Sequence, residues 1–496
     1  KVKDGVIDVC VAAQIKVTEL SARFVAQLKR YYYVTPTSYL ELISTFSALI
    51  ASKRKEILTA KSRYENGLEK IVSTEAMVDG MKADLTALQP QLVKASAETD
   101  VMIANIEVVS ADVSAKAAVV EKDAAECAEQ AAAAEARIRA VHARHIGTGR
   151  LAPAEVEERL RRLTYSYRME RLADADLVIE AVIEEMPAKQ AVFRALSPIV
   201  RRDCILASNT SRLDINQLAD QVDAPERVLG LHFFSPAHVM RLLEIVRADR
   251  TSAEVLSTAL TVALRLRKQP IIAGVCDGFI GNRILGRWWA QCDFMLEDGA
   301  FPEEIDRALE GHGFAMGPYA VADLAGLDIA WAGRKANAAT RNPNARDVKI
   351  IDWLCEQGRF GQKTGKGWYD HTGGKRAVDP LVHGLVERAS AARGVVRRTV
   401  APDEIVARVL AAMVNEGCKL VAEGIALRPS DIDVALVHGY GYPAWRGGPM
   451  HEADSLGLDK ILATVKTMQQ DGPDFLPAPL LEDLVASGRS LASLNN

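Results

Sequence analysis

Two residues twelve positions apart, His232 and Glu244, form the first pair in this chain that could do acid–base chemistry. Each lies in a short apolar run, residues 229–236 and 240–246, and a Ser-Pro turn joins the two predicted strands. If the second strand returns beside the first, the carboxylate meets the imidazole. Such a partner fixes the tautomer of the imidazole and raises its basicity, which suits a general base acting on an alcohol. The alternative is a histidine that is merely hydrogen-bonded at a strand end.

The elements before this pair alternate between strand and helix. Apolar runs at 176–183 and 204–211 predict strands, and residues 187–200 and 213–222 predict helices. Such alternation predicts a mostly parallel sheet with polar groups gathered at the carboxyl ends of its strands. The polar residues expected at that edge are Glu184, Asn209, Ser211 and His232. A long helix is predicted to follow, with Asp277 as its cap and Asn282 in its first turns.

Four motifs carry a family resemblance. Ala207-Ser-Asn-Thr-Ser-Arg, Leu231-His-Phe-Phe-Ser-Pro, Arg241-Leu-Leu-Glu-Ile-Val and Gly278-Phe-Ile-Gly-Asn-Arg resemble the 3-hydroxyacyl-CoA dehydrogenases over about 147–370. The pattern Pro-x-x-Ile-Asp followed by Gly-Pro recurs between 401 and 496, which indicates a second helical copy. That tandem is similar to the multifunctional enzymes of fatty-acid β-oxidation, although their enoyl-CoA hydratase is not found in this sequence.

The resemblance implies an NAD-dependent oxidation of 3-hydroxyacyl-CoA to 3-oxoacyl-CoA. In it, His232 takes the hydroxyl proton while hydride leaves C3, Glu244 orients His232, and Ser211 and Asn282 hydrogen-bond the substrate oxygens. The positions that match cofactor contacts are Glu184, Lys189, Asn209, Ser211 and Lys363. Lys189 as a solvated helix residue and Lys363 as a loop charge are the open alternatives. Ser235 replaces an Asn common in the family, which leaves one cofactor contact in doubt.

The first part of the chain has a different character. Residues 53–145 are rich in Ala, Glu and Lys, and apolar side chains recur at sevens from Tyr64 to Val120, which predicts one long coiled-coil helix with an irregularity at Pro90. A single solvated helix is the alternative. Motifs such as Arg63-Tyr-Glu-Asn-Gly-Leu give residues 5–136, approximately, a resemblance to a dynein heavy chain. The matching parts are the end of the fourth ATPase module and the outgoing helix of the stalk. No phosphate-binding loop accompanies it, so no ATP hydrolysis is expected.

A dinucleotide fingerprint occurs formally at Gly147-Thr-Gly-Arg-Leu-Ala152. The fingerprint requires a buried strand before it, and here Arg and His residues precede it, so we expect no cofactor loop at this place. The family's first βαβ unit therefore has no counterpart before residue 147. Its loss predicts weakened NAD binding and an exposed apolar sheet edge. Two truncated resemblances meeting at one point suggest a spliced or mis-assembled reading frame. A transcript or peptide spanning residues 135–150 would support a real fusion, and separate messages alone would refute it.

The predicted fold is α/β plus all-α, with an incomplete Rossmann-like parallel sheet. The expected domains are a dynein-like helical segment (1–145), a partial NAD-binding domain (146–270), a helical dehydrogenase domain (271–371), a linker (372–400) and a second helical domain (401–496).

Bulk properties exclude several classes of function. A net charge of −4 shows no basic footprint for nucleic acid or a membrane surface, and seven scattered cysteines contain no zinc-site spacing. No apolar run reaches membrane-spanning length, the start lacks a signal-peptide core, and Ser-Leu-Asn-Asn496 is no peroxisomal address, so the cytosol is the expected compartment.

Two functions from different classes remain open at this point. One is an NAD-dependent dehydrogenase, impaired by loss of the Gly-rich loop, with a 3-hydroxyacyl-CoA substrate. The other is a non-catalytic coiled-coil interaction protein or a fusion artefact. A coiled-coil partner helix and a homodimer are the protein partners that the sequence leaves open.

Overall fold

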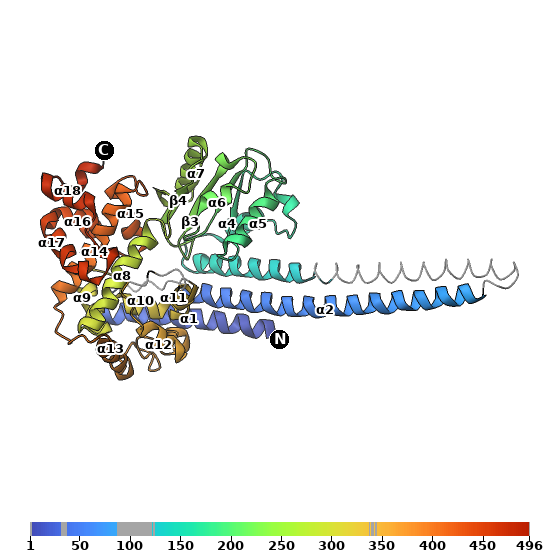
Figure 1. Ribbon diagram of the computed structural model, residues 1–496, viewed down its shortest axis with the longest axis horizontal. Helices are drawn as coiled ribbons and strands as arrows, with labels where there is room; N and C mark the ends of the chain where they lie inside the picture. The colour runs from blue at the N-terminus through green and yellow to red at the C-terminus, as the bar shows by residue number, and fades with distance from the viewer. Residues whose placement is uncertain are drawn as a thin grey trace. The chain divides into compact units, whose positions relative to one another are not determined.

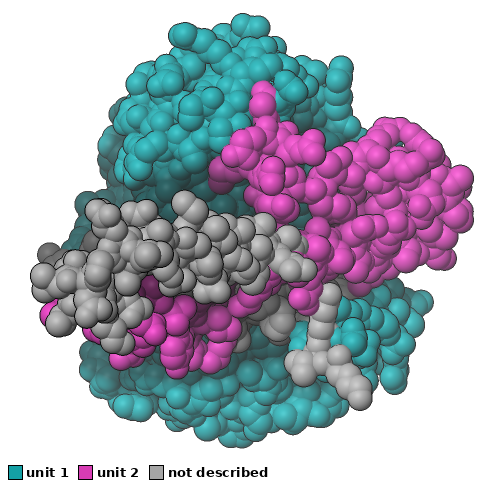
Figure 2. All heavy atoms as spheres, turned by 90° about the vertical axis from the view of Figure 1, so that its right-hand side faces the viewer, with its two compact units in different colours: residues 1–46, 174–496 teal, residues 47–173 magenta. Residues whose placement is uncertain are grey.

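The computed structural model describes residues 2–30, 37–86, 122, 125–336, 338, 342 and 345–495. The chain divides into two compact units, coloured separately in Figure 2. One contains Lys1–Phe46 and Asp174–Asn496, and the other contains Ser47–Ala173.

The unit from 47 to 173 is helical. It contains most of α2 (Thr37–Thr86), a helix over 125–147 and α4 (Pro153–Leu160). Arg54 and Glu126 form an ion pair of 3.9 Å, whereas one continuous helix would separate them by about 108 Å at 1.5 Å per residue. The prediction of one helix through residue 145 is therefore wrong, since α2 and the helix over 125–147 are separate helices that lie side by side.

The apolar heptad positions of α2 are exposed. Tyr64 is 81% exposed and Ile71 is 64% exposed, and Val78 and Met81 are exposed as well. The heptad positions from 87 to 120 lie outside the described residues. No second strand of a coiled coil covers this stripe within the described part of the unit, so the coiled coil is not confirmed.

The other unit contains a five-stranded sheet (Figure 1). The strand order follows the chain, and β1, β2 and β3 are parallel, β3 and β4 antiparallel, and β4 and β5 parallel. The strands are β1 (Leu177–Glu180), β2 (Ile205–Ser208), β3 (Val228–Phe233), β4 (Leu242–Arg247) and β5 (Gln269–Ala273). The alternating pattern predicted the first four, and β5 was not predicted.

Helices α5 (Met186–Leu196), α6 (Ile215–Ala219) and α7 (Ala253–Arg265) connect the strands. Ser252 caps α7 by accepting a hydrogen bond from the amide of Val255. One apolar cluster joins α7 to the sheet and includes Leu229 and Leu231 of β3. Because side chains alternate along a strand, Gly230 and His232 face the opposite side, away from that core.

The edge strand β1 is apolar and partly uncovered. Ile179 is 40% exposed, and Val182 and Ile183 just beyond the strand are also exposed. Within the described residues β1 is the last strand on its side of the sheet, so this edge is apolar and partly exposed, in agreement with the sequence-based expectation.

The rest of this unit is helical, and its long helix α8 (Gly281–Asp298) packs against α14 (Pro402–Ala422). The segment expected as a linker contains α13 (Pro380–Arg393), which buries Val382, Leu385 and Val386 and packs on α8. That segment is therefore part of the packed helical region. The other α-helices described in this unit are α1 (Val2–Leu28), α9 (Pro302–His312), α10 (Pro318–Ala325), α11 (Leu327–Ala336), α12 (Ile350–Glu356), α15 (Pro429–Gly439), α16 (Pro449–Leu456), α17 (Leu458–Met468) and α18 (Pro479–Ser487), together with the start of α2.

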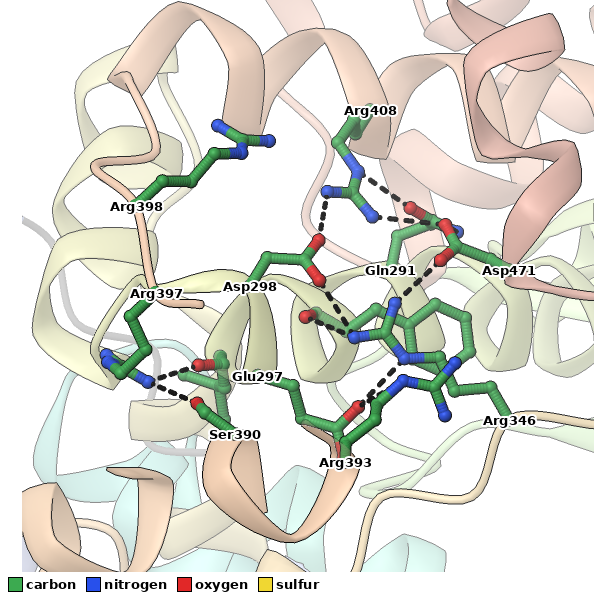
Figure 3. Close-up of polar contacts among 12 residues, drawn as sticks. Gln291, Glu297, Asp298, Arg346, Ser390, Arg393, Arg397, Arg398, Arg408 and Asp471 are labelled. Atoms are coloured by element: carbon green, nitrogen blue, oxygen red, sulfur yellow. Dashed lines mark hydrogen bonds and ion pairs between the residues drawn. The ribbon is translucent and has the colours of Figure 1, made fainter. Parts of the chain in front are cut away.

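A buried ionic network holds the two helical copies together (Figure 3). Arg346 contacts Glu297 at 2.8 Å, Asp298 at 2.9 Å and Asp471 at 2.6 Å. Arg408 of α14 reaches Asp298 at 2.7 Å and Asp471 at 3.1 Å. Two guanidinium groups thus share three carboxylates in the interior, and Asp298 and Asp471 each contact both guanidinium groups. In the described part of the chain, no helix is long and apolar enough to cross a membrane.

Candidate active site

His232 and Glu244 are direct cross-strand partners on β3 and β4. Both side chains are buried, and His232 Nδ1 lies 2.6 Å from Glu244 Oε2. Residues directly opposite on antiparallel strands place their side chains on the same face, which explains the contact. The predicted pairing of the two residues is present, and the contact at Nδ1 leaves Nε2 as the ring nitrogen available to a substrate.

The second carboxylate oxygen of Glu244 is held by the start of α8. Oε1 accepts a hydrogen bond of 2.9 Å from the amide of Gly281. Glu244 thus joins the histidine to a helix N-terminus, whose free amides favour negative charge. The carboxylate is fixed at both oxygens, so it holds the imidazole in one orientation.

Aromatic rings enclose the imidazole. The ring of Phe234 lies 4.4 Å and that of Phe279 lies 5.9 Å from the His232 ring, centre to centre. Phe279 is fully buried. These rings limit the access of water to the dyad, which strengthens its electrostatic interactions.

Glu184 gathers the polar residues at the ends of β1 and β2. Its Oε1 accepts hydrogen bonds from Thr210 Oγ1 at 2.7 Å, from the Ser211 amide at 2.7 Å and from Ser211 Oγ at 3.0 Å. Burial raises the pKa of Glu184, but these bonds and the ammonium of Lys189 outweigh it and lower the pKa. The side chain of Glu184 is still 37% exposed, so it remains accessible to a ligand.

Asn209 ties β2 to β3. Its Oδ1 accepts a hydrogen bond of 2.8 Å from the amide of Phe233, the residue after His232. The structure therefore brings Glu184, Asn209, Ser211 and His232 to one edge of the sheet.

Lys189 is not a solvated helix residue, because its side chain is only 1% exposed. Its ammonium contacts Glu180 Oε1 at 2.9 Å, the Val182 carbonyl at 3.3 Å and Glu184 Oε2 at 3.2 Å. Three contacts use the three protons of the ammonium. Lys189 therefore acts on the site through Glu184.

Lys363 lies elsewhere, in a short turn of the first helical copy (Gln362–Thr364), where it forms an ion pair with Asp328 of α11.

Asp277 does not cap α8 as predicted. It receives two bonds from the guanidinium of Arg212, at 2.8 Å and 2.9 Å, which ties the loop after β2 to the start of α8.

Asn282 in the first turn of α8 connects the two halves of the site. Its Nδ2 donates to the Ser211 carbonyl at 3.3 Å, while its Oδ1 accepts a hydrogen bond of 2.7 Å from Tyr440 Oη. Burial raises the pKa of Tyr440 well above its usual range, so the hydroxyl keeps the proton that it donates. Asn282 is consequently held by a residue of the second helical copy, 158 positions away.

Tyr440 and Gly281 were missed in the sequence. Gly281 is required because a Cβ there would lie 2.2 Å from the Tyr440 ring. The ring of Tyr440 also packs 5.4 Å from Phe234. The only sequence signals were a glycine at a helix start and an aromatic in the repeated motif, and neither indicates the other.

The formal fingerprint at residues 147–152 follows the end of the helix over 125–147. The element before it is a helix and not the strand that a dinucleotide loop requires. Among the described residues, no group of three or more His, Cys, Asp or Glu side chains could hold a metal ion.

Comparisons with known proteins give a consistent result for most of the chain. Residues 99–276 match the family described as 3-hydroxyacyl-CoA dehydrogenase, NAD binding domain. Residues 278–371 and 405–492 both match 3-hydroxyacyl-CoA dehydrogenase, C-terminal domain. Residues 1–49 match P-loop containing dynein motor region D4. The dynein-like part is thus supported over 1–49 only, and residues 99–136 fall within the dehydrogenase match.

Relatives agree with these matches. The chain is 44% identical over 350 residues to a peroxisomal bifunctional enzyme of Danio rerio, covering 67% of this chain and 49% of the relative. It is 41% identical over 344 residues to that of Homo sapiens, covering 66% and 47%. The chain therefore spans about half the length of these relatives.

Two solved structures share the fold. The 3-hydroxybutyryl-CoA dehydrogenase of Escherichia coli gives a TM-score of 0.61 at 28% identity, covering 71% of this chain and 91% of that one. The dehydrogenase part of multifunctional enzyme 1 from C. elegans gives 0.51 at 29% identity, covering 70% and 80%.

Proposed function

The chain belongs to the 3-hydroxyacyl-CoA dehydrogenase family, and on that premise we propose that it interconverts a 3-hydroxyacyl-CoA and the corresponding 3-oxoacyl-CoA in fatty-acid β-oxidation. The observation that carries this proposal is the His232–Glu244 dyad, with Glu244 anchored on the amide of Gly281 beside Asn282.

His232 serves as the base in the oxidation. Its Nε2 takes the proton of the 3-hydroxyl, and Glu244 stabilises the imidazolium that results. Asn282 and Ser211 hydrogen-bond the oxygens of the substrate near C3. In the reverse direction the imidazolium returns the proton to the oxygen of the 3-oxo group.

NAD, when bound, accepts the hydride that leaves C3. The exposed carboxylate of Glu184 and the half-buried amide of Asn209, at the carboxyl ends of parallel strands, fit the polar nicotinamide–ribose end of that cofactor. Together with the hydrogen bonds from Thr210 and Ser211, the ammonium of Lys189 lowers the pKa of Glu184, and its contact of 3.2 Å helps to hold the carboxylate in place. Lys363 is assigned to the cofactor by the resemblance alone.

The adenine half of the cofactor site is less complete in the described residues. Those before β1 contain helices and turns and no strand, and the glycines before residue 147 are the isolated Gly5, Gly67 and Gly80. A Gly-rich turn at a helix N-terminus supplies the amides that bind a pyrophosphate. We therefore expect NAD to bind this chain weakly.

The test is the oxidation of NADH with acetoacetyl-CoA, together with a titration of NAD monitored by calorimetry. Turnover that saturates in both substrates supports the proposal. An inactive wild-type chain that also shows no saturable binding of NAD would reject the activity for this chain.

The compartment follows the relatives. The relatives of Danio rerio and Homo sapiens are named as peroxisomal, and a multifunctional β-oxidation protein of Brassica napus that is 35% identical is named as glyoxysomal. These names do not support the expected cytosolic location, and we propose a peroxisomal or glyoxysomal location for this chain. Fluorescence microscopy of the tagged full-length protein would test it.

A protein partner is proposed for α2. Its exposed Tyr64, Ile71 and Val78 are spaced by seven and match a coiled-coil seam, in this chain's homodimer or with another helix. Sedimentation velocity of the wild type and of Ile71→Glu measures whether the chain assembles through this seam. A concentration-dependent assembly that the variant loses supports the seam, and a monomeric wild type argues against the homodimer.

A further inference from the structure

The two helical copies repeat the same pair of carboxylates. In the first copy Asp306 of α9 accepts hydrogen bonds of 3.0 Å from the amides of Tyr319 and Ala320 at the start of α10. In the second copy Asp433 of α15 accepts bonds from the amides of Met450, at 2.7 Å, and His451, at 3.2 Å, at the start of α16. Asp306 and Asp433 are therefore equivalent.

A second carboxylate defines a further pair of equivalent positions. Asp323 accepts bonds from the amides of Trp368 and Tyr369, at 2.7 Å and 2.9 Å. Asp454 likewise accepts bonds of 2.8 Å from the amides of Leu491 and Ala492. Tyr369 and Ala492 thus occupy the same place in the two copies.

The side chains at this place differ by an entire phenol ring. Tyr369 is buried, and its Oη donates a 2.7 Å hydrogen bond to Asp306 Oδ2. Ala492 cannot fill that space or reach Asp433. The second copy has instead a cavity of about 370 Å³, whose lining includes Asp433, Val437 and Ala492.

The walls of the two places also differ in charge. Glu310 lies beside Tyr369 in the first copy, where Arg376 pairs with it and covers the Tyr369 ring at 5.0 Å. Val437 of α15 takes the position of Glu310 in the second copy. The cavity consequently offers an apolar wall at Val437 and two carboxyl groups, those of Asp433 and Asp454, of which Asp454 already accepts two amide hydrogen bonds; its volume is within the range of small-molecule sites.

We propose that this cavity is a binding site for a small neutral molecule with a phenol-type ring, whose hydroxyl donates a hydrogen bond to Asp433. The ring occupies the space that Tyr369 fills in the first copy, and the hydroxyl takes the part of Tyr369 Oη. This site lies on α15 and α16 and does not depend on the dehydrogenase activity.

The experiment is calorimetric titration of the full-length chain with p-cresol, which is the tyrosine side chain as a free molecule. Toluene, which lacks the hydroxyl, is the comparison ligand. We expect saturable binding of p-cresol about fivefold tighter than binding of toluene, since a hydrogen bond contributes about 1 kcal/mol.

Two variants localise the binding. Ala492→Tyr fills the cavity from the chain itself, should abolish p-cresol binding and should raise the melting temperature. Ser493→Tyr adds the same side chain one residue outside the lining and should leave binding intact. If Ala492→Tyr does not fold, Val437→Phe fills the same space from α15 and replaces it.

The proposal is overturned by a wild type that shows no saturable binding of p-cresol. Undiminished binding in both cavity-filling variants would also overturn it, because the ligand would then bind elsewhere. Equal affinity for toluene and p-cresol would refute the part assigned to Asp433.

Discussion

Replacing Tyr440 by phenylalanine removes one hydroxyl and tests whether the second helical copy shapes the active site. Tyr440 Oη donates a 2.7 Å hydrogen bond to Asn282 Oδ1. The Nδ2 of the same amide donates to the carbonyl of Ser211 in the loop after β2. Phenylalanine keeps the ring that packs on Gly281 and Phe234. The change therefore isolates the orientation of the Asn282 amide.

The magnitude follows from the acceptor that is left without a donor. Without the Tyr440 hydroxyl, Asn282 Oδ1 has lost its donor, and an unsatisfied polar group costs about 1–3 kcal/mol. We expect the Asn282 amide to rotate in response, so that the transition state loses this amount of stabilisation. At about 1.4 kcal/mol per factor of ten, kcat for acetoacetyl-CoA should fall about 5- to 150-fold. The KM for NADH should change little, because the hydroxyl faces Asn282.

The assay is steady-state oxidation of NADH with acetoacetyl-CoA, and Tyr442→Phe is the matched control. Tyr442 is also a buried tyrosine, two residues on, but its hydroxyl donates to Glu452, away from the dyad. The control should lose stability and keep kcat. In an Asn282→Ala background Tyr440→Phe should have no further effect on kcat. The reasoning is refuted if kcat of Tyr440→Phe stays within twofold of the wild type.

Three further changes have defined outcomes. Glu244→Gln keeps the size of the side chain but can accept only one of the two hydrogen bonds, so its amide donates to His232 Nδ1 and the ring proton moves to Nε2; kcat should fall by about 100-fold or more in NADH oxidation, in a chain that calorimetry shows to be folded. Lys189→Met leaves the buried Glu180 unpaired and should destabilise the fold by about 3–5 kcal/mol in urea unfolding, and equal stability would contradict the pairing. Burial raises the pKa of Asp293 to about 7, above its unfolded value near 4, so the wild type loses stability as pH rises from about 4 to 7. Asp293→Asn does not titrate and should be more stable than the wild type at pH 8 by about 2–4 kcal/mol, an advantage that disappears near pH 4 in urea unfolding curves.

The pairing of His232 with Glu244 could be predicted because it is local. Two short strands and a turn decide which side chains face one another, and a spacing of twelve residues places these two opposite. The gathering of Asn209 and Ser211 at one edge follows from the same kind of rule for parallel strands.

Tyr440 could not be predicted in the same way. It reaches Asn282 from 158 residues away, through the packing of α15 beside α8, and no local pattern reports such a contact. Lys189 shows the same limit, because a lysine near the start of a helix is ordinarily exposed and only the buried Glu180 explains its position. The heptads of α2 indicated helix correctly, but periodicity gives no signal for where a helix ends, as the Arg54–Glu126 contact shows.

The central claim is that His232, oriented by Glu244, is the general base of a 3-hydroxyacyl-CoA dehydrogenase. The most direct measurement is kcat for NADH oxidation with acetoacetyl-CoA in His232→Ala, compared with the wild type and with His238→Ala in the following loop. We predict a loss of about 1,000-fold or more in His232→Ala, in a chain that calorimetry shows to be folded, and a rate near that of the wild type in His238→Ala. A wild-type rate retained in His232→Ala would contradict the account.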